Sequence, residues 1–138
     1  MPDKIVLLDT NFLLIPGQFG VDIFSELRRA CDFPFKLAVV QPVMDELNRL
    51  TEDKATSAKD RKAAHLALQL IKVKGVPVLG GYGKVFKSAD KAILHLASAN
   101  GKELVVATQD RELKSMLREK GVAVAVLRQN KYIIIEGV

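Results

Sequence analysis

Residues 104–113 read LVVATQDREL, a strand-forming run that gives way within three residues to Asp110. The N-terminal run IVLL, residues 5–8, stops in a similar way, because Asp9 comes directly after it. One such carboxylate is ordinary, since Asp and Thr are favoured where a helix begins. Because two strand-forming runs end in an acidic residue, the residues that follow every strand-like run in the chain must be compared.

Short apolar runs alternate with helical patterns along most of the sequence. The expected strands are Ile5 to Leu8, Leu37 to Val40, Val76 to Leu79, Leu104 to Ala107, Val122 to Leu127 and, at an edge, Tyr132 to Glu136. The expected helices span about 21–30 and 58–74, or start near Pro42, Ser88 and Gln109, the last ending before Gly121. This alternation predicts an α/β fold in which helices cover both faces of a parallel sheet. With 138 residues, the chain is expected to form a single domain, 1–138.

Composition narrows the class of protein. Hydrophobic residues make up 49% of the chain and the formal net charge is +5, which suits a folded protein with a polyanionic partner. Cys31 is the only cysteine, so a thiolate metal cluster is excluded and a small buried side chain is expected there. His65 and His95 lack the spacing of a zinc-binding pair. No apolar run has membrane-spanning length and no signal-peptide pattern is present, so we expect a cytoplasmic protein with no membrane contact.

Four acidic residues lie just beyond the expected strands. Asp9 comes directly after the first strand and Asp110 shortly after the fourth. Glu46 lies one helical turn after the second, and Asp90 comes after the glycine-rich stretch beyond the third. Because the carboxyl ends of parallel strands share one edge, where loops and helix N-termini converge, we expect all four carboxylates on one rim.

Helix geometry separates inward from outward acidic residues. Each residue advances about 100° around a helix axis. Glu46 then lies roughly 65° from the centre of its apolar stripe, whereas its neighbour Asp45 lies roughly 165° away and faces solvent. Asp90 and Asp110 lie roughly 75° and 65° from their stripes, and Glu112, roughly 90° away, is a peripheral candidate.

Each of these carboxylates has an alternative role as a helix cap or first-turn residue. Four of them close together would repel one another unless protons or cations neutralised the charge. Mg²⁺ and Mn²⁺ prefer carboxylate and water oxygens. Two such ions about 3.5–4 Å apart can activate water and stabilise the leaving oxygen of a phosphodiester. The acidic set therefore predicts metal-dependent phosphodiester hydrolysis.

In four ordered stretches the chain resembles the PIN-domain nucleases. The family pattern is a strand ending in Asp-x-Asn, a Glu early in the second helix, an Asp opening a later helix, and Thr/Ser-Asn-Asp-x-x-Leu after the following strand. Here the stretches read LLDTNFL, PVMDELNRL, SADKAIL and ATQDREL. Gln109 stands where the family commonly has Asn, which alters a supporting hydrogen bond and leaves the acidic set intact. PGQFGVDIF looks most like archaeal members, grouped both with VapC-type toxins and with nucleases that process small-subunit ribosomal RNA.

The resemblance implies a three-layer α/β/α sandwich with a central, mainly parallel sheet. It also implies an endoribonuclease that depends on Mg²⁺ or Mn²⁺. Metal-binding and catalytic roles fall on Asp9, Glu46, Asp90 and Asp110, with Asn11 and Thr108 as polar supports. The implied partners are an RNA substrate, an antitoxin protein in the favoured toxin role, and a second copy of the chain. Residues 16–20, PGQFG, are read as a turn with Phe19 as an aromatic plug, a self-association surface being the alternative.

Basic and aromatic residues near the expected rim are candidates for RNA contact. In the stretch GGYGKVFK, residues 80–87, a base could stack on Tyr82 while Lys84 and Lys87 hold phosphates. The simpler interpretation of this stretch is a connection anchored by Phe86. Three further phosphate candidates lie beyond the fourth strand: Arg111, Lys114 and Arg118.

Two other enzyme classes fit the residues poorly. A phosphatase of the haloacid dehalogenase type needs a second Asp two residues after the first, where this chain has Asn11. A receiver domain needs an Asp at the end of its third strand, where Gly80 and Gly81 stand. The remaining alternative is a noncatalytic RNA-binding or assembly module with the nuclease fold, against which the complete acidic set argues.

Overall fold

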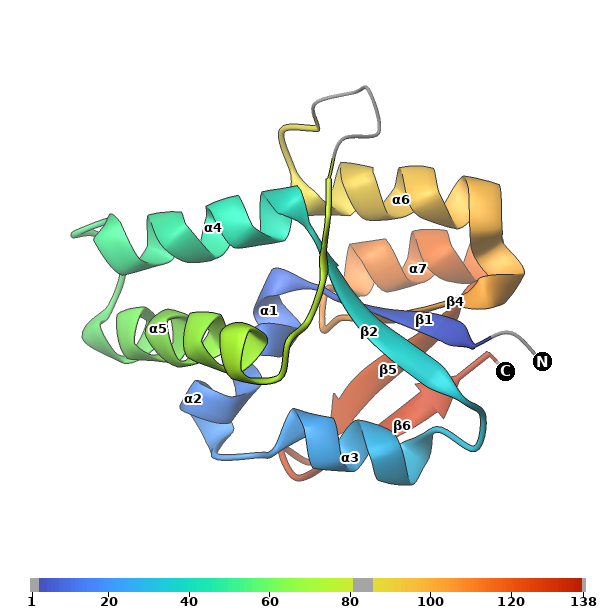
Figure 1. Cartoon of the computed structure of the whole chain (residues 1–138), viewed down its shortest axis with the longest axis horizontal. Helices are drawn as coiled ribbons and strands as arrows, with labels where there is room; N and C mark the ends of the chain where they lie inside the picture. Colours follow the sequence, from blue (N-terminus) through green and yellow to red (C-terminus); the bar gives the residue numbers. More distant parts are fainter. Residues whose placement is uncertain (1–2, 81–85, 138) are drawn as a thin grey trace.

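The computed structural model of the chain describes residues 3–80 and 86–137. Within these ranges, six strands form one sheet in the order β3-β2-β1-β4-β5-β6 (Figure 1). The strands are β1 Lys4–Leu8, β2 Phe35–Val40, β3 Val78–Leu79, β4 Leu104–Ala107, β5 Ala123–Arg128 and β6 Tyr132–Glu136. All neighbouring pairs are parallel except β5 and β6, which are antiparallel. The predicted mainly parallel sheet with an added edge strand is confirmed.

Helices fill the connections between the strands. Between β1 and β2 lie α1 Thr10–Leu13, α2 Ile15–Phe19 and α3 Ile23–Ala30, and between β2 and β3 lie α4 Gln41–Glu52 and α5 Ala58–Val73. Further along are α6 Ala89–Asn100, the 3-10 turn η1 Gly101–Glu103 and α7 Arg111–Glu119. Figure 1 shows α6 and α7 on one side of the sheet and α3 on the other, which confirms the predicted layers. In the part of the chain described, no helix combines the length and the apolar character needed to cross a bilayer.

The central strands are buried on both faces. All four residues of β4 are buried, as are the first five of β5. Strands covered by helices on both sides form continuous apolar runs rather than alternating ones. Phe12, Leu47 and Ile93 extend the core from α1, α4 and α6. The ends of these strands are therefore held in fixed positions.

The stretch at residues 16–20 differs from the sequence prediction of a turn. It belongs to helix α2, which has Pro16 in its first turn and ends at Gly20 with φ of 68°. At Gly17 an added Cβ would lie 2.5 Å from the Cα of Ala63, so α2 packs backbone-to-backbone against α5. Phe19 is 46% exposed, and the prediction that it is a buried plug is wrong.

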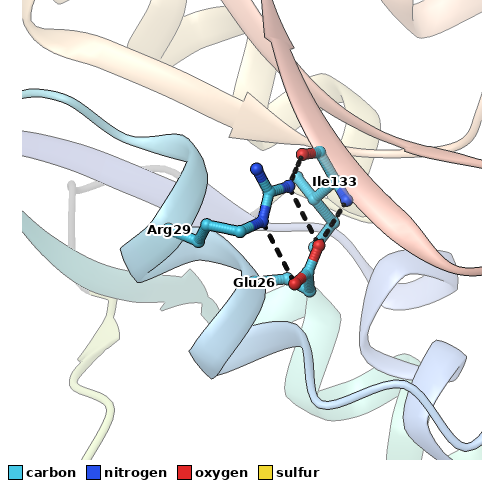
Figure 2. A network of polar contacts seen from close by, with 3 residues as sticks. All are labelled: Glu26, Arg29 and Ile133. Atoms are coloured by element: carbon cyan, nitrogen blue, oxygen red, sulfur yellow. Dashed lines mark hydrogen bonds and ion pairs between the residues drawn. The ribbon is translucent and has the colours of Figure 1, made fainter.

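A polar clasp holds α3 on the edge strand β6, as Figure 2 shows. The Ile133 N–H donates to Glu26 Oε1 at 3.0 Å, and the Ile133 carbonyl accepts from Arg29 Nη2 at 2.7 Å. Glu26 and Arg29 form an ion pair at 3.0 Å. The hydrogen bond from Arg29, followed by that from the Ile133 amide, lowers the pKa of Glu26. The two side chains supply one edge residue with the donor and acceptor that a further strand would provide.

Candidate functional site

The order of the strands reverses between β1 and β4. From β1 the chain moves outward to β2 and β3, and it then returns to place β4 on the other side of β1. At such a point the connections lead in opposite directions and leave a crevice beyond the carboxyl ends of the strands. Leu8 of β1 is in register with Ala107 of β4. Asp9 and Thr108, the next residues of the two strands, therefore meet at the crevice.

Asp9 is a nearly enclosed carboxylate, only 6% exposed. Its Oδ1 accepts the Thr10 N–H at 2.9 Å, and its Oδ2 accepts the hydroxyl of buried Thr108 at 2.7 Å. Burial raises the pKa of Asp9; the two hydrogen bonds oppose this effect, and the negative charges of Glu46 and Asp110 add to it. The fold thus brings Glu46 and Asp110 close enough to act on the charge of Asp9.

Glu46 links three helices. Its Oε1 accepts the Thr10 hydroxyl at 2.9 Å, and its Oε2 accepts the backbone N–H of Ala89 at 3.0 Å. Ala89 is the first residue of α6, so Glu46 satisfies one of the free amides at that helix start. Asp45, by contrast, is exposed and its carboxylate accepts from Gln41. The two neighbours face as the helix geometry predicts.

Hydrogen bonds also fix the segment beyond β4. The Asp110 N–H donates to Thr108 Oγ1 at 3.1 Å, and the Asp110 carboxylate caps α7 by accepting the Leu113 N–H at 3.0 Å. Asn11 Oδ1 accepts the Gln109 N–H at 3.0 Å and lies 3.4 Å from the Thr108 hydroxyl. Thr108 thus contacts both Asp9 and Asp110, and Asn11 contacts the Gln109 amide between Thr108 and Asp110; their role as polar supports of a metal site stays a prediction.

Two other residues contribute contacts that sequence reasoning missed. Thr10 joins Asp9 to Glu46, and the Gln109 side chain accepts the Leu127 N–H of β5 at 2.8 Å. A Thr after an Asp at a helix start is also the signature of an ordinary cap. Nothing in the sequence indicated that Thr10 bridges Asp9 and Glu46, because Glu46 is 36 residues away from Thr10.

The chemistry of the donors suits a hard divalent cation. Asp9, Glu46 and Asp110 offer carboxylate oxygens, and their like charges interact. Beside the Glu46-bound start of α6, the buried Ser88 Oγ has no hydrogen-bond partner among the residues described, so another polar oxygen there remains unsatisfied. These features fit a cation near Asp9 and the start of α6.

A complete cluster of ligands does not form in the described structure. Within residues 3–80 and 86–137, no three His, Cys, Asp or Glu side chains are grouped so that they could hold a metal ion. Asp90 lies in a described segment, accepts from the Lys91 N–H at 3.0 Å, and is not among the groups that raise the pKa of Asp9. The participation of Asp90, and metal binding by the set as a whole, stay predictions.

The candidates for RNA contact fall into separate groups. Tyr82 and Lys84 lie outside the described residues. Arg118 is exposed but pairs with Glu136 at 3.1 Å, so part of its charge is compensated. Three remaining cations have no ion-pair partner in the described ranges: Lys87, Arg111 and Lys114.

Comparison with known proteins decides the family. The family profile described as a PIN-like domain matches residues 6–130. The chain belongs to the PIN-like domain family. The family resemblance read from the four sequence stretches is therefore confirmed.

Two ribonucleases and one solved structure match nearly the full length of the chain. Ribonuclease VapC4 of Methanocaldococcus jannaschii is 36% identical over 133 residues, which cover 96% of both chains. Ribonuclease VapC9 of Archaeoglobus fulgidus is 25% identical over 134 residues, which cover 96% of this chain and 90% of the relative. The solved structure of the PIN domain endonuclease Utp24 superposes with a TM-score of 0.77 and 24% identity, covering 97% of this chain and 92% of that one. The last comparison confirms the PIN-like fold.

Proposed function

We propose that the chain is a divalent-metal-dependent endoribonuclease that hydrolyses RNA phosphodiesters. The observation that carries the proposal is the series of hydrogen bonds at the reversal point of the sheet, where Thr10 joins Glu46 to Asp9 and Thr108 joins Asp9 to the Asp110 amide. The 36% identity to a protein named a ribonuclease supports the assignment of RNA as substrate.

The proposed metal ligands are Asp9, Glu46, Asp90 and Asp110, which together would hold Mg²⁺ or Mn²⁺. Such an ion, when bound, supplies activation of water and stabilisation of the leaving oxygen. Thr108 and the Thr10 amide orient the Asp9 carboxylate. Glu46 is held between α1 and α6 by its two hydrogen bonds.

Charge favours a cation at this position. The same like charges that raise the pKa of Asp9 would attract a cation, which competes with protons for these carboxylates. Lys87 and Arg111 are exposed and Lys114 is half-buried, and each lies within a few residues of a proposed metal ligand in the sequence. Their positive charges would attract the phosphates of RNA near the rim. The protein thus combines acidic ligands for the metal with basic residues for the RNA backbone.

In the cell we assign the chain the role of the toxin in a VapC-type pair. The names of both curated relatives support this assignment. It implies a cytoplasmic setting, an antitoxin protein as inhibitory partner and a homodimer as the candidate assembly. The proposed ribonuclease activity does not depend on this cellular role.

Cleavage of labelled RNA by purified protein tests the proposal. Activity should require Mg²⁺ or Mn²⁺, disappear with EDTA, and fall at least about 100-fold in Asp9→Asn and Glu46→Gln, because a bound metal supplies several kcal/mol. The matched control is Asp45→Asn, which removes the adjacent exposed charge and should cleave normally. Activity that persists unchanged in both site variants would assign the cleavage to a contaminant or another site. RNA binding without cleavage would favour the noncatalytic module.

A further inference from the structure

Strand β4 ends before its neighbour β5 does. Ala107, the last residue of β4, is in register with Ala125, and the Thr108 N–H still donates to the Ala125 carbonyl at 3.2 Å. The chain then turns away into α7, whereas β5 continues to Arg128. The Leu127 amide of β5 is left beyond the end of β4.

The side chain of Gln109 takes the place of the missing strand. Its Oε1 accepts the Leu127 N–H at 2.8 Å. Leu127 is only 6% exposed, so water is a poor substitute partner for this amide, and an unpaired buried N–H is costly. The Gln109 side chain therefore extends the hydrogen-bond ladder between β4 and β5 by one acceptor.

Gln109 is also fixed through its backbone. Its N–H donates to Asn11 Oδ1 at 3.0 Å, which ties the same residue to α1. Thr108, on one side, donates to Asp9, and Asp110, on the other, caps α7. A residue held from β5 and from α1 limits how far its two neighbours can move.

The length of the side chain matters for this contact. Asn, which the family pattern commonly has at this position, is shorter by one methylene group. With the backbone fixed by Asn11, a shorter amide would not extend as far toward β5. The contact with Leu127 therefore depends on the length of the Gln109 side chain.

We propose that Gln109 is a positioning residue of the carboxylate site, which holds Thr108 and Asp110 in place by replacing the end of β4 beside Leu127. This inference rests on the proposed function, because the positioned groups are the proposed metal ligands and their support. Gln109 itself is not assigned any contact with metal or RNA.

Amide hydrogen exchange in the metal-free protein gives the first test. Gln109→Met keeps a similar length and lacks the amide oxygen, since a thioether is a weak acceptor. Protection of the Leu127 and Asp110 amides should fall at least about tenfold in this variant. The Asp9 amide, which donates to the Ala107 carbonyl at 2.9 Å, should keep its protection. Gln109→Glu retains an acceptor oxygen and should restore the protection of Leu127.

Calorimetric titration with Mn²⁺ gives the second test. Gln109→Met should bind Mn²⁺ about tenfold more weakly, the size of effect expected when a supporting contact is lost. Gln109→Glu should bind no more weakly than the unaltered chain. The matched control is Gln18→Met. This variant loses the hydrogen bond from the Gln18 side-chain amide to Asp60, away from the site, and should leave Mn²⁺ affinity unchanged.

Two results separate the possible failures. The positioning role is overturned if Gln109→Met lowers the protection of the Leu127 amide but leaves the protection of the Asp110 amide and the Mn²⁺ affinity unaltered. The contact would then affect Leu127 alone. If the unaltered chain itself does not bind Mn²⁺, the proposed metal chemistry fails. The Asp110 amide then decides by itself whether Gln109 positions the segment, with loss of protection supporting that role and retention overturning it.

Discussion

Replacing Asp9 by Asn is expected to stabilise the metal-free protein at neutral pH. The Asp9 carboxyl is buried, and its pKa is raised chiefly by that burial, with the charges of Glu46 and Asp110 adding to it. An Asn at this position carries no charge, keeps an oxygen for the Thr10 N–H, and has an amide that can donate to Thr108 Oγ1. The substitution therefore removes the repulsion while keeping local contacts.

The sign of the expected change in stability comes from proton linkage. A carboxyl with a raised pKa binds its proton more tightly in the folded than in the unfolded chain. Its contribution to stability is complete below the ordinary pKa of 3.8 and is lost as the pH rises through the raised value. Each tenfold difference in proton affinity changes the free energy of unfolding by about 1.4 kcal/mol at neutral pH. We expect Asp9→Asn to be more stable than the unaltered chain at pH 7, and most of this gain to vanish near pH 3.

Urea unfolding in EDTA at the two pH values measures this difference. Asp45→Asn is the control, because that carboxylate is exposed and should change stability by no more than about 0.5 kcal/mol. With Mn²⁺ added, the unaltered chain should gain stability and Asp9→Asn should gain little, since the proposed ligand is missing. A loss of stability in metal-free Asp9→Asn at pH 7, or a gain that is equal at both pH values, would refute the charge argument.

Three further predictions concern packing, the α3 clasp and RNA. Gly17→Ala should lower the free energy of unfolding by about 1–3 kcal/mol, because the new Cβ meets the Ala63 backbone; an unchanged urea midpoint would show that α2 can move aside. Arg29→Met should lower hydrogen-exchange protection around Ile133 by breaking the clasp on β6; full protection of that edge would contradict the role of the clasp. Arg111→Ala should weaken RNA binding and reduce its salt dependence by about one phosphate contact without changing Mn²⁺ affinity; fluorescence anisotropy across salt concentrations checks this, and an unaltered salt slope would exclude the contact.

The sheet could be predicted because each of its main strands contains a continuous apolar run. All of β4 is buried, so its continuous run needs no alternation to be recognised. The third strand is shorter than predicted, Val78–Leu79 rather than Val76 to Leu79. Pro77 cannot donate to a neighbouring strand, although its carbonyl accepts the Val39 N–H at 3.0 Å. Strand β3 therefore begins after Pro77, at Val78.

Helix α2 could not be predicted, because its cause lies elsewhere in the sequence. Pro and two Gly residues within five positions favour a turn, and only contact with α5 makes Gly17 useful inside a helix. The start of α3 was predicted more closely. The predicted start is Val21, and the helix begins at Ile23, where the Asp22 carboxylate caps it by accepting hydrogen bonds from the Phe24 and Ser25 amides. Local capping is visible in sequence, whereas close packing of distant helices is not.

The candidate site divides in the same way. Asp9 and Asp110 could be placed near each other because strand ends meet at one rim, and Glu46 was indicated by the apolar stripe of its helix. The hydrogen bonds of Thr10 and Gln109 could not be predicted, since each depends on a residue brought close only by the fold. Asp90 has the expected place at the start of α6, but its link to the other carboxylates remains a prediction.

Paramagnetic broadening of backbone amide signals during a Mn²⁺ titration tests the central claim most directly. A single divalent-cation site at the rim predicts early, selective loss of the Thr10, Ala89, Lys91 and Asp110 amide signals, with those of the distant clasp at Glu26 and Ile133 unaffected. Broadening that instead begins around exposed acidic residues such as Asp45 and Asp53, or that spreads evenly over the surface, would contradict the account.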